Sequence, residues 1–201
     1  RRYASMFGLN RPSGIEISET TPELTTEDPE RSAMGQGTNS YSNVQLSRYV
    51  AAIANSGTVF DLSLLDKMTD SEGNLIQDFT PEATGHVDIA DSTWDAVHQG
   101  MRAVITDGSV NKIFKDLEVE IAGKTGTAQE SRTRGNHAFF ISYGPYTNPE
   151  ICVTVNIPYG YSSSNAAMVA KNVYRFYYGY TDLESILGSG ALEVSNVKVG
   201  D

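Results

Sequence analysis

Apolar residues recur at helical spacing most clearly in the segment that follows Ser42. Ser42 and Gln45 stand at the spacing of a capping box, which marks the start of a helix. Three apolar residues then repeat at the interval that places them on one helix face: Leu46, Val50 and Ile53. The run Asn55-Ser56-Gly57 supplies a stop. The pattern therefore predicts a helix over residues 42–55.

Two more helices follow from the same periodicity. One begins near Asp91, and four of its residues form a buried face: Trp94, Val97, Met101 and Val104. The other begins near Ser164, and its predicted buried face is Ala166, Val169, Val173 and Phe176. Residues 1–9 have the character of the last turns of a helix that ends at Gly8. We therefore expect this opening segment to pack against a preceding part of a longer parent chain.

Apolar runs predict strands in two parts of the chain. Residues 58–80 have the pattern of a hairpin whose turn lies at residues 70–74. Three later runs are candidate strands: Val119–Lys124, His137–Tyr143 and Ile151–Ile157. Their short connections favour antiparallel neighbours. We predict an α+β fold with helices packed on an antiparallel sheet, in which residues 1–178 belong to one domain and residues 179–201 form a tail.

Composition limits the classes of protein that this chain can represent. Its 201 residues are 39% hydrophobic and 20% charged, as in a globular domain or a part of one. The net charge of −10 and the pI of about 4.7 argue against a nucleic-acid partner. Cys152 is the single cysteine, and its apolar surroundings in sequence indicate a buried structural thiol. His86, His98 and His137 lack the spacing of metal ligands, so we expect no metal and no cofactor.

The strongest chemical signal is the run from Gly123 to Ala128, which contains a lysine, a threonine and a glycine in succession. It stands at the end of the first of the three candidate strands. Lys124 offers a cation, and Thr125 and Thr127 offer hydroxyl donors that suit a carboxylate. Gly126 lacks a Cβ, which lets a ligand lie against the strand backbone. Lys-Thr-Gly is also a signature element of penicillin-binding proteins and related β-lactamases.

The run from Gly123 to Ala128 also has two other interpretations. A surface turn would carry the same letters without a function. A phosphate-binding loop also contains Gly-Lys-Thr, but it requires a glycine at the position where this chain has Glu118. It also requires a helix directly after the lysine, whereas residues 138–141 have the pattern of a strand. The nucleotide-binding interpretation therefore fails.

Further segments, in the same order along the chain, resemble class B penicillin-binding proteins. They lie at residues 3–15, 33–37, 44–57, 100–104 and 122–129. Among them, Gly35-Gln36-Gly37 is similar to the family's Gly-Gln-Gly region. The resemblance spans roughly residues 3–178 and looks closest to the elongation-type transpeptidases that act with the rod-shape machinery. It implies the transpeptidase fold that penicillin-binding proteins share with serine β-lactamases.

The resemblance also implies a mechanism. The family works through Ser-x-x-Lys, which carries the nucleophile and its base, then Ser-x-Asn, then Lys-Thr-Gly. The first two precede everything seen here, so this chain resembles the C-terminal half of the catalytic domain and by itself should be inactive. Lys124 would be the catalytic residue of the third motif, while Thr125, Gly126 and Thr127 would bind the substrate's terminal carboxylate. The backbone N–H of Thr127 would supply half of the oxyanion hole.

Partners and location follow from the same resemblance. The parent would crosslink peptidoglycan stem peptides through an acyl-serine intermediate, and β-lactams would bind at the same site. The missing N-terminal half of the domain would complete the cleft, and cell-elongation machinery is a further expected partner. The parent would lie at the extracytoplasmic face of the bacterial cell membrane, anchored by an N-terminal segment outside these residues.

Two formal motif matches are decoys. Ser109 with Lys112 matches Ser-x-x-Lys, and Ser163 with Asn165 matches Ser-x-Asn. We interpret both serines as helix N-caps, because each stands where a helix is expected to begin. Two alternatives stay open: a serine β-lactamase or β-lactam sensor domain, and a non-catalytic binding or scaffold module. A Ser-x-x-Lys and a Ser-x-Asn ahead of Arg1 in the parent would decide between them.

Overall fold

The computed structural model describes residues 1–27, 29–130 and 132–188. The chain divides into two compact units, one over Arg1–Trp94 and one that begins at Asp95. Both helices and antiparallel strands are present, as the α+β prediction requires. The expected tail from residue 179 contains helix α7 (Leu183–Gly188), and residues 189–201 lie outside the described residues.

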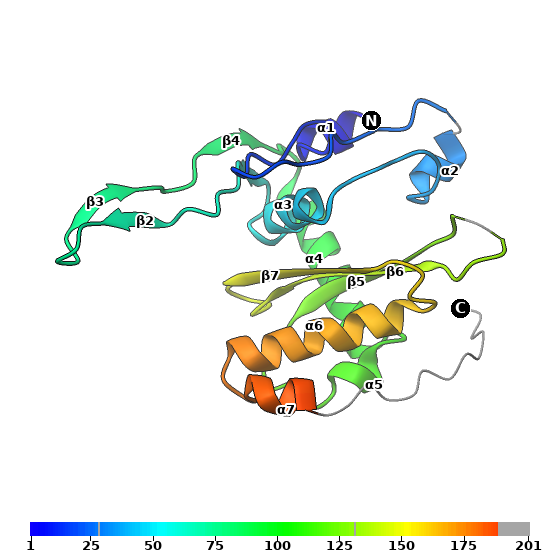
Figure 1. Cartoon of the computed structure of the whole chain (residues 1–201). Coiled ribbons are helices and arrows are strands. Elements are labelled where there is room, and N and C mark those ends of the chain that lie inside the picture. Colours follow the sequence, from blue (N-terminus) through cyan, green and yellow to red (C-terminus); the bar gives the residue numbers. More distant parts are fainter. Residues whose placement is uncertain (28, 131, 189–201) are drawn as a thin grey trace. The chain divides into compact units, whose positions relative to one another are not determined.

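The first unit consists of short helices and two antiparallel strand pairs (Figure 1). Its elements are α1 (Arg2–Met6), α2 (Pro29–Ala33), α3 (Asn43–Ala54), β1 (Thr58–Phe60), β2 (Lys67–Thr69), β3 (Leu75–Asp78) and β4 (Ala83–His86). The predicted hairpin is confirmed as β2 paired with β3, with shorter strands than expected. The pairing of β1 with β4, which flank this hairpin in sequence, was not predicted.

Helix α3 begins and ends where its sequence signals lie. The Ser42 hydroxyl accepts from the backbone N–H of Gln45 at 3.2 Å, and the Gln45 side chain accepts from the backbone N–H of Ser42 at 3.0 Å. This capping box satisfies donors that the first turn leaves unpaired. Val50 and Ile53 are buried, so the apolar stripe faces the interior. The predicted helix is confirmed.

The second unit is a three-stranded antiparallel sheet with helices packed on it (Figure 1). Its elements are most of α4 (Asp91–Thr106), then α5 (Asn111–Phe114), β5 (Ala122–Ala128), β6 (His137–Gly144), β7 (Ile151–Ile157), α6 (Ser163–Tyr177) and α7. The strand order is β5-β6-β7, so the predicted antiparallel neighbours are confirmed. However, β5 begins three residues later than predicted, which places Lys-Thr-Gly inside the strand and not at its end.

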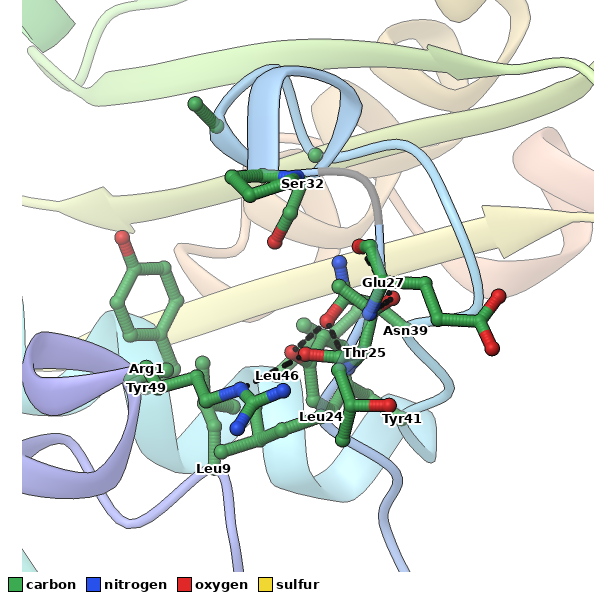
Figure 2. A pocket seen from close by; sticks show the side chains of 15 residues that line it. Arg1, Leu9, Leu24, Thr25, Glu27, Ser32, Asn39, Tyr41, Leu46 and Tyr49 are labelled. Carbon is green, nitrogen blue, oxygen red and sulfur yellow. Dashed lines mark hydrogen bonds between the residues drawn. The ribbon is translucent and has the colours of Figure 1, made fainter.

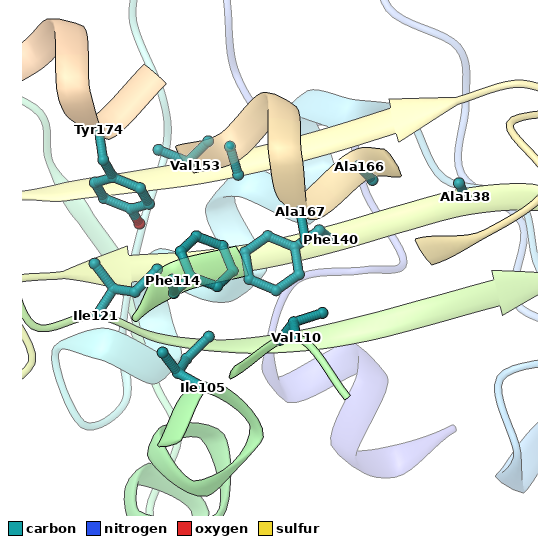
Figure 3. Packing of buried hydrophobic residues seen from close by; sticks show 11 residues of the cluster. Ile105, Val110, Phe114, Ile121, Ala138, Phe140, Val153, Ala166, Ala167 and Tyr174 are labelled. Atoms are coloured by element: carbon teal, nitrogen blue, oxygen red, sulfur yellow. The ribbon is translucent and has the colours of Figure 1, made fainter. Parts of the chain in front are cut away.

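The core of this unit lies between the sheet and α6 (Figure 3). Phe114 and Phe140 stack with ring centroids 5.4 Å apart. Small residues of α6 pack against the sheet: Ala166, Ala167 and Ala170. An alanine stripe lets a helix approach a sheet closely, and Tyr174 of α6 is also fully buried in this core. The predicted buried face is therefore wrong at Val169, Val173 and Phe176, all of which are exposed.

The two serine decoys do not cap helices as predicted. The N-cap of α5 is Val110 and not Ser109, and its side chain makes no capping hydrogen bond. The N-cap of α6 is Ser162, whose hydroxyl accepts from the backbone N–H of Ser164. Ser163 lies in the first turn of α6, where its side chain is buried. Ser162 is the cap because its backbone is extended, as an N-cap requires, whereas Ser163 is already part of the helix.

Candidate functional site

Strand β5 brings the candidate residues together on the outer strand of the second unit's sheet. Its seven residues pair with β6 without a register shift, from Ala122 opposite Tyr143 to Ala128 opposite His137. The sheet leaves the other edge of β5 unpaired with any strand among the described residues. Backbone groups along such an edge can bind an extended peptide.

The register sorts the candidate side chains onto two faces. Thr125 stands opposite Phe140 and Thr127 opposite Ala138, both of which are buried in the core beneath α6. Side chains alternate along a strand, so Lys124 leaves β5 on the opposite face from the two threonines. A single ligand could therefore meet Lys124 and Thr127 only along the outer edge of β5, where both faces are within reach.

Lys124 carries an exposed cation. Its Nζ donates to the backbone carbonyl of Thr125 at 2.7 Å, so the ammonium folds back over its own strand. The acceptor in this contact is a neutral backbone carbonyl and not a carboxylate. A carboxylate that approached β5 would offer the ammonium a charge-assisted hydrogen bond, which is stronger than a bond to a neutral carbonyl.

The two glycines of β5 differ in what surrounds them. A Cβ on Gly123 would stand 2.7 Å from Cζ of Phe140, inside the core. A Cβ on Gly126 would meet only the Cβ of Phe139, at 3.3 Å. Gly123 is therefore required for the packing of β5 on β6, whereas the space above Gly126 is open enough for a ligand to approach the backbone.

A polar cluster that the sequence did not reveal lies just beyond this strand. Glu130 follows β5, His137 opens β6, and Tyr159 follows β7. His137 Nε2 and Glu130 Oε2 are 3.1 Å apart, and hydrogen bonds from Tyr159 and His137 lower the pKa of the Glu130 carboxyl. The three residues are separated by up to 29 positions, so only the sheet topology brings them together.

A pocket of about 630 Å³ lies in the first unit, and none of the predicted site residues lines it (Figure 2). Arg1 Nε donates to the carbonyl of Thr25 at 3.1 Å on its wall, and Asn39 Oδ1 accepts from the backbone N–H of Thr25 at 3.0 Å. Gly35, from the Gly-Gln-Gly run, also lines it. Its polar groups are largely paired with one another, and none of the described lining residues forms a catalytic arrangement.

Among the described residues, no group of three or more histidine, cysteine, aspartate or glutamate side chains is arranged to hold a metal ion. No helix in the same part of the chain has the length and apolarity to cross a bilayer.

Comparison with known proteins decides the family. Residues 1–175 match the model of the penicillin binding protein transpeptidase domain. The chain belongs to this family. The resemblance inferred from the sequence is therefore confirmed, and Lys124 to Gly126 lie within the matched region of a transpeptidase domain.

Curated relatives agree with this assignment. The peptidoglycan D,D-transpeptidase MrdA of Haemophilus influenzae is 29% identical over 85% of this chain, and penicillin-binding protein 2A of Bacillus subtilis is 30% identical over 82% of it. The chain spans only 31% and 26% of the lengths of these two relatives. It therefore corresponds to a part of each of them.

Solved transpeptidases share the fold. Penicillin-binding protein 2B of Streptococcus pneumoniae superposes with a TM-score of 0.78 at 27% identity, over 91% of this chain and 32% of its own. PBP2 of Pseudomonas aeruginosa, solved in complex with WCK 5153, gives a TM-score of 0.71 at 26% identity, over 88% of this chain and 42% of its own. These structures confirm the predicted mixture of helices and antiparallel sheet.

Proposed function

We propose that this chain is the C-terminal part of the catalytic domain of a bacterial peptidoglycan D,D-transpeptidase of class B. One observation supports it most: an outer strand presents an exposed lysine followed by Thr-Gly-Thr, in a chain that matches the transpeptidase family over residues 1–175. The order of motifs in the family places the serine nucleophile in a preceding part of the parent protein.

The proposed chemistry divides between the two parts of the parent. A serine Oγ from the preceding part attacks the carbonyl carbon of the penultimate D-Ala, and the terminal D-Ala leaves. The amine of a second stem peptide then attacks the acyl-serine ester and forms the crosslink. The stem peptide lies along the outer edge of β5, where Lys124, Thr125 and Thr127 bind its terminal carboxylate. The backbone N–H of Thr127 donates to the oxyanion of the tetrahedral intermediate.

The parent's location and partners belong to the same proposal. We infer that it acts at the extracytoplasmic face of the bacterial membrane, on stem peptides, and that β-lactams acylate the same serine. We infer an elongation role with the rod-shape machinery from the sequence resemblance, and the MrdA relative supports the D,D-transpeptidase activity. One similar solved structure concerns the coordination of polymerization and crosslinking by a peptidoglycan synthase complex, and the alignment covers 96% of this chain.

Labelling of the full-length parent with a fluorescent penicillin tests this function. We expect wild type to form a stable acyl-enzyme and Lys124→Ala to acylate about 10²–10³-fold more slowly, the effect of losing one preorganised transition-state contact. Lys112→Ala is the matched control, because Lys112 is also an exposed lysine but lies on α5. Equal acylation of wild type and Lys124→Ala would contradict the role of Lys124. Rapid hydrolysis of the penicillin would favour a β-lactamase instead.

A further inference from the structure

One end of the three-stranded sheet is held by hydrogen bonds that connect all of its strands. Glu130 lies two residues beyond the end of β5, and Tyr159 lies two residues beyond the end of β7. Between them, His137 is the first residue of β6. We call Glu130, His137 and Tyr159 the strand-end cluster.

The hydrogen bonds assign different roles to the two ring nitrogens of His137. The backbone N–H of Tyr159 donates to His137 Nδ1 at 3.3 Å, so Nδ1 is the acceptor. Nε2 is then the donor, and it donates to Glu130 Oε2 at 3.1 Å. The Tyr159 hydroxyl also lowers the pKa of the Glu130 carboxyl. His137 thus contacts both of the other members of the cluster.

Tyr159 occupies a backbone conformation that tyrosine seldom adopts. Its φ is +54°, in the left-handed region, which is unfavourable for a residue with a Cβ. Its ring lies 4.8 Å from the His137 ring, centroid to centroid. Arg134 Nη1 donates to the Tyr159 hydroxyl at 2.9 Å, and the guanidinium carbon lies 5.4 Å from the centroid of the Tyr159 ring. Contacts with His137 and Arg134 therefore hold Tyr159 in this conformation.

This cluster adjoins the proposed site directly. His137 pairs with Ala128 across β5 and β6, and the next pair along is Ala138 with Thr127. Glu130 is only three residues beyond Thr127 in sequence. The segment that follows β5 is therefore tied back to the sheet. Glu130, in that segment, contacts His137, which is the residue opposite Ala128 at the end of β5.

We propose that Glu130, His137 and Tyr159 are positioning residues that fix the C-terminal end of β5, and with it the backbone N–H of Thr127, for acyl transfer. The proposal rests on the proposed transpeptidase function. The Glu130 side chain is 55% exposed and that of His137 is 22% exposed, so their pairing adds little to folding stability. Its effect is on geometry, because an oxyanion donor acts only when it is held close to the reacting position.

The test is the acylation kinetics of the full-length parent with a fluorescent penicillin, resolved into the binding constant Ks and the acylation rate constant k2. Glu130→Ala should lower k2 about tenfold, with Ks and the melting temperature nearly unchanged, because the donor acts in the transition state. Glu130→Gln should restore k2 to within about twofold of wild type, since its amide oxygen still accepts from His137 Nε2. Tyr159→Phe, which removes the hydroxyl that accepts from Arg134, should lower k2 in the same direction.

Glu118→Ala is the matched control, because Glu118 is an exposed glutamate that precedes β5. It should leave k2 unchanged. Unchanged k2 in Glu130→Ala, or equal losses in Glu130→Ala and Glu130→Gln, would overturn the positioning role while wild type still acylates. A wild-type parent that does not acylate at all would instead refute the proposed function, and the positioning role with it.

Discussion

Gly123 lies so close to Phe140 that a Cβ on the glycine would stand 2.7 Å from Cζ of the ring. The same Cβ would stand 2.9 Å from the carbonyl oxygen of Ile141, which is backbone and cannot move independently of β6. Phe140 is fully buried and stacks on Phe114, so it cannot rotate away. The first glycine of the motif strand is therefore a packing residue.

Substituting the two glycines of β5 one at a time should show that Gly123 is required for packing and Gly126 for the approach of a ligand. Gly123→Ala should lower the free energy of unfolding by about 1–3 kcal/mol, the usual cost of overpacking a core. Gly126→Ala should cost less than about 1 kcal/mol, because its added methyl meets only Phe139. Denaturant unfolding measures both changes. In the parent, Gly126→Ala should nonetheless slow penicillin acylation; equal stability losses for the two variants would contradict this distinction.

Arg48 organises the first unit through backbone carbonyls. Its side chain is 1% exposed, and its guanidinium donates to the carbonyl oxygens of Gly8, Arg11 and Pro12, the last at 2.6 Å. Asp61 lies 3.5 Å away and supplies a counter-charge. Burial lowers the pKa of the Arg48 guanidinium, whose two Nη groups are paired with the carbonyls and the carboxylate. Its Nε is also buried and has no hydrogen-bond partner among the described residues.

Arg48→Met should therefore destabilise the first unit strongly. The substitution leaves several carbonyl groups without a donor, and we expect a loss of about 3 kcal/mol of unfolding free energy. Arg2→Met is the control, since Arg2 is exposed and should change stability by less than about 0.5 kcal/mol. Denaturant unfolding of both variants compares the losses, and similar small effects would show that Arg48 is dispensable.

Local signals predicted the elements whose residues lie close together in sequence. The capping box of Ser42 and Gln45 marked α3, and the short connections around residues 137–157 marked the antiparallel sheet. The candidate site was also visible in sequence, because Lys124 to Thr127 are consecutive. Their opposite faces follow from strand alternation once β5 is known to run through the motif.

Other features depend on contacts that no local pattern encodes. On α6, both the alanine side and the side with Val169 and Phe176 have helical periodicity, so hydrophobicity alone favoured the wrong face. The alanines are buried because the sheet is close to them. Likewise, Glu130 and Tyr159 meet only because β5 and β7 flank β6. Neither the buried face of α6 nor the strand-end cluster could be predicted without the tertiary structure.

Cys152 should react slowly in the folded chain. Burial raises the pKa of its thiol to about 11, so only about one molecule in a thousand carries the thiolate at pH 8. Alkylation by iodoacetamide should be at least about 100-fold faster in denaturant, where the pKa returns to roughly 8.5. Mass spectrometry follows the single site directly. Equal rates in both states would contradict the burial of this thiol.

The same raised pKa sets the direction of a pH effect. Above about pH 8.5 the thiol ionises in the unfolded chain but not in the folded one. Ionisation therefore stabilises the unfolded state relative to the folded state. The contribution of Cys152 to stability is thus complete below this pH and declines as the pH rises toward 11. Cys152→Ala should remove this decline from a plot of unfolding free energy against pH, and an unchanged alkaline slope would assign it to other groups.

The polypeptide of residues 1–201 alone should not be labelled covalently by a fluorescent penicillin. Its formal Ser-x-x-Lys match places Ser109 in the exposed turn before α5, while Lys112 lies on that four-residue helix. An activated serine nucleophile has a base within hydrogen-bond reach that takes its proton. We do not expect Ser109 and Lys112 to form such a pair. Denaturing electrophoresis should therefore show a labelled band for the full-length parent and none at the mass of this polypeptide. A labelled band at that mass would place a nucleophile within these residues, and Ser109→Ala would then show whether Ser109 is that residue.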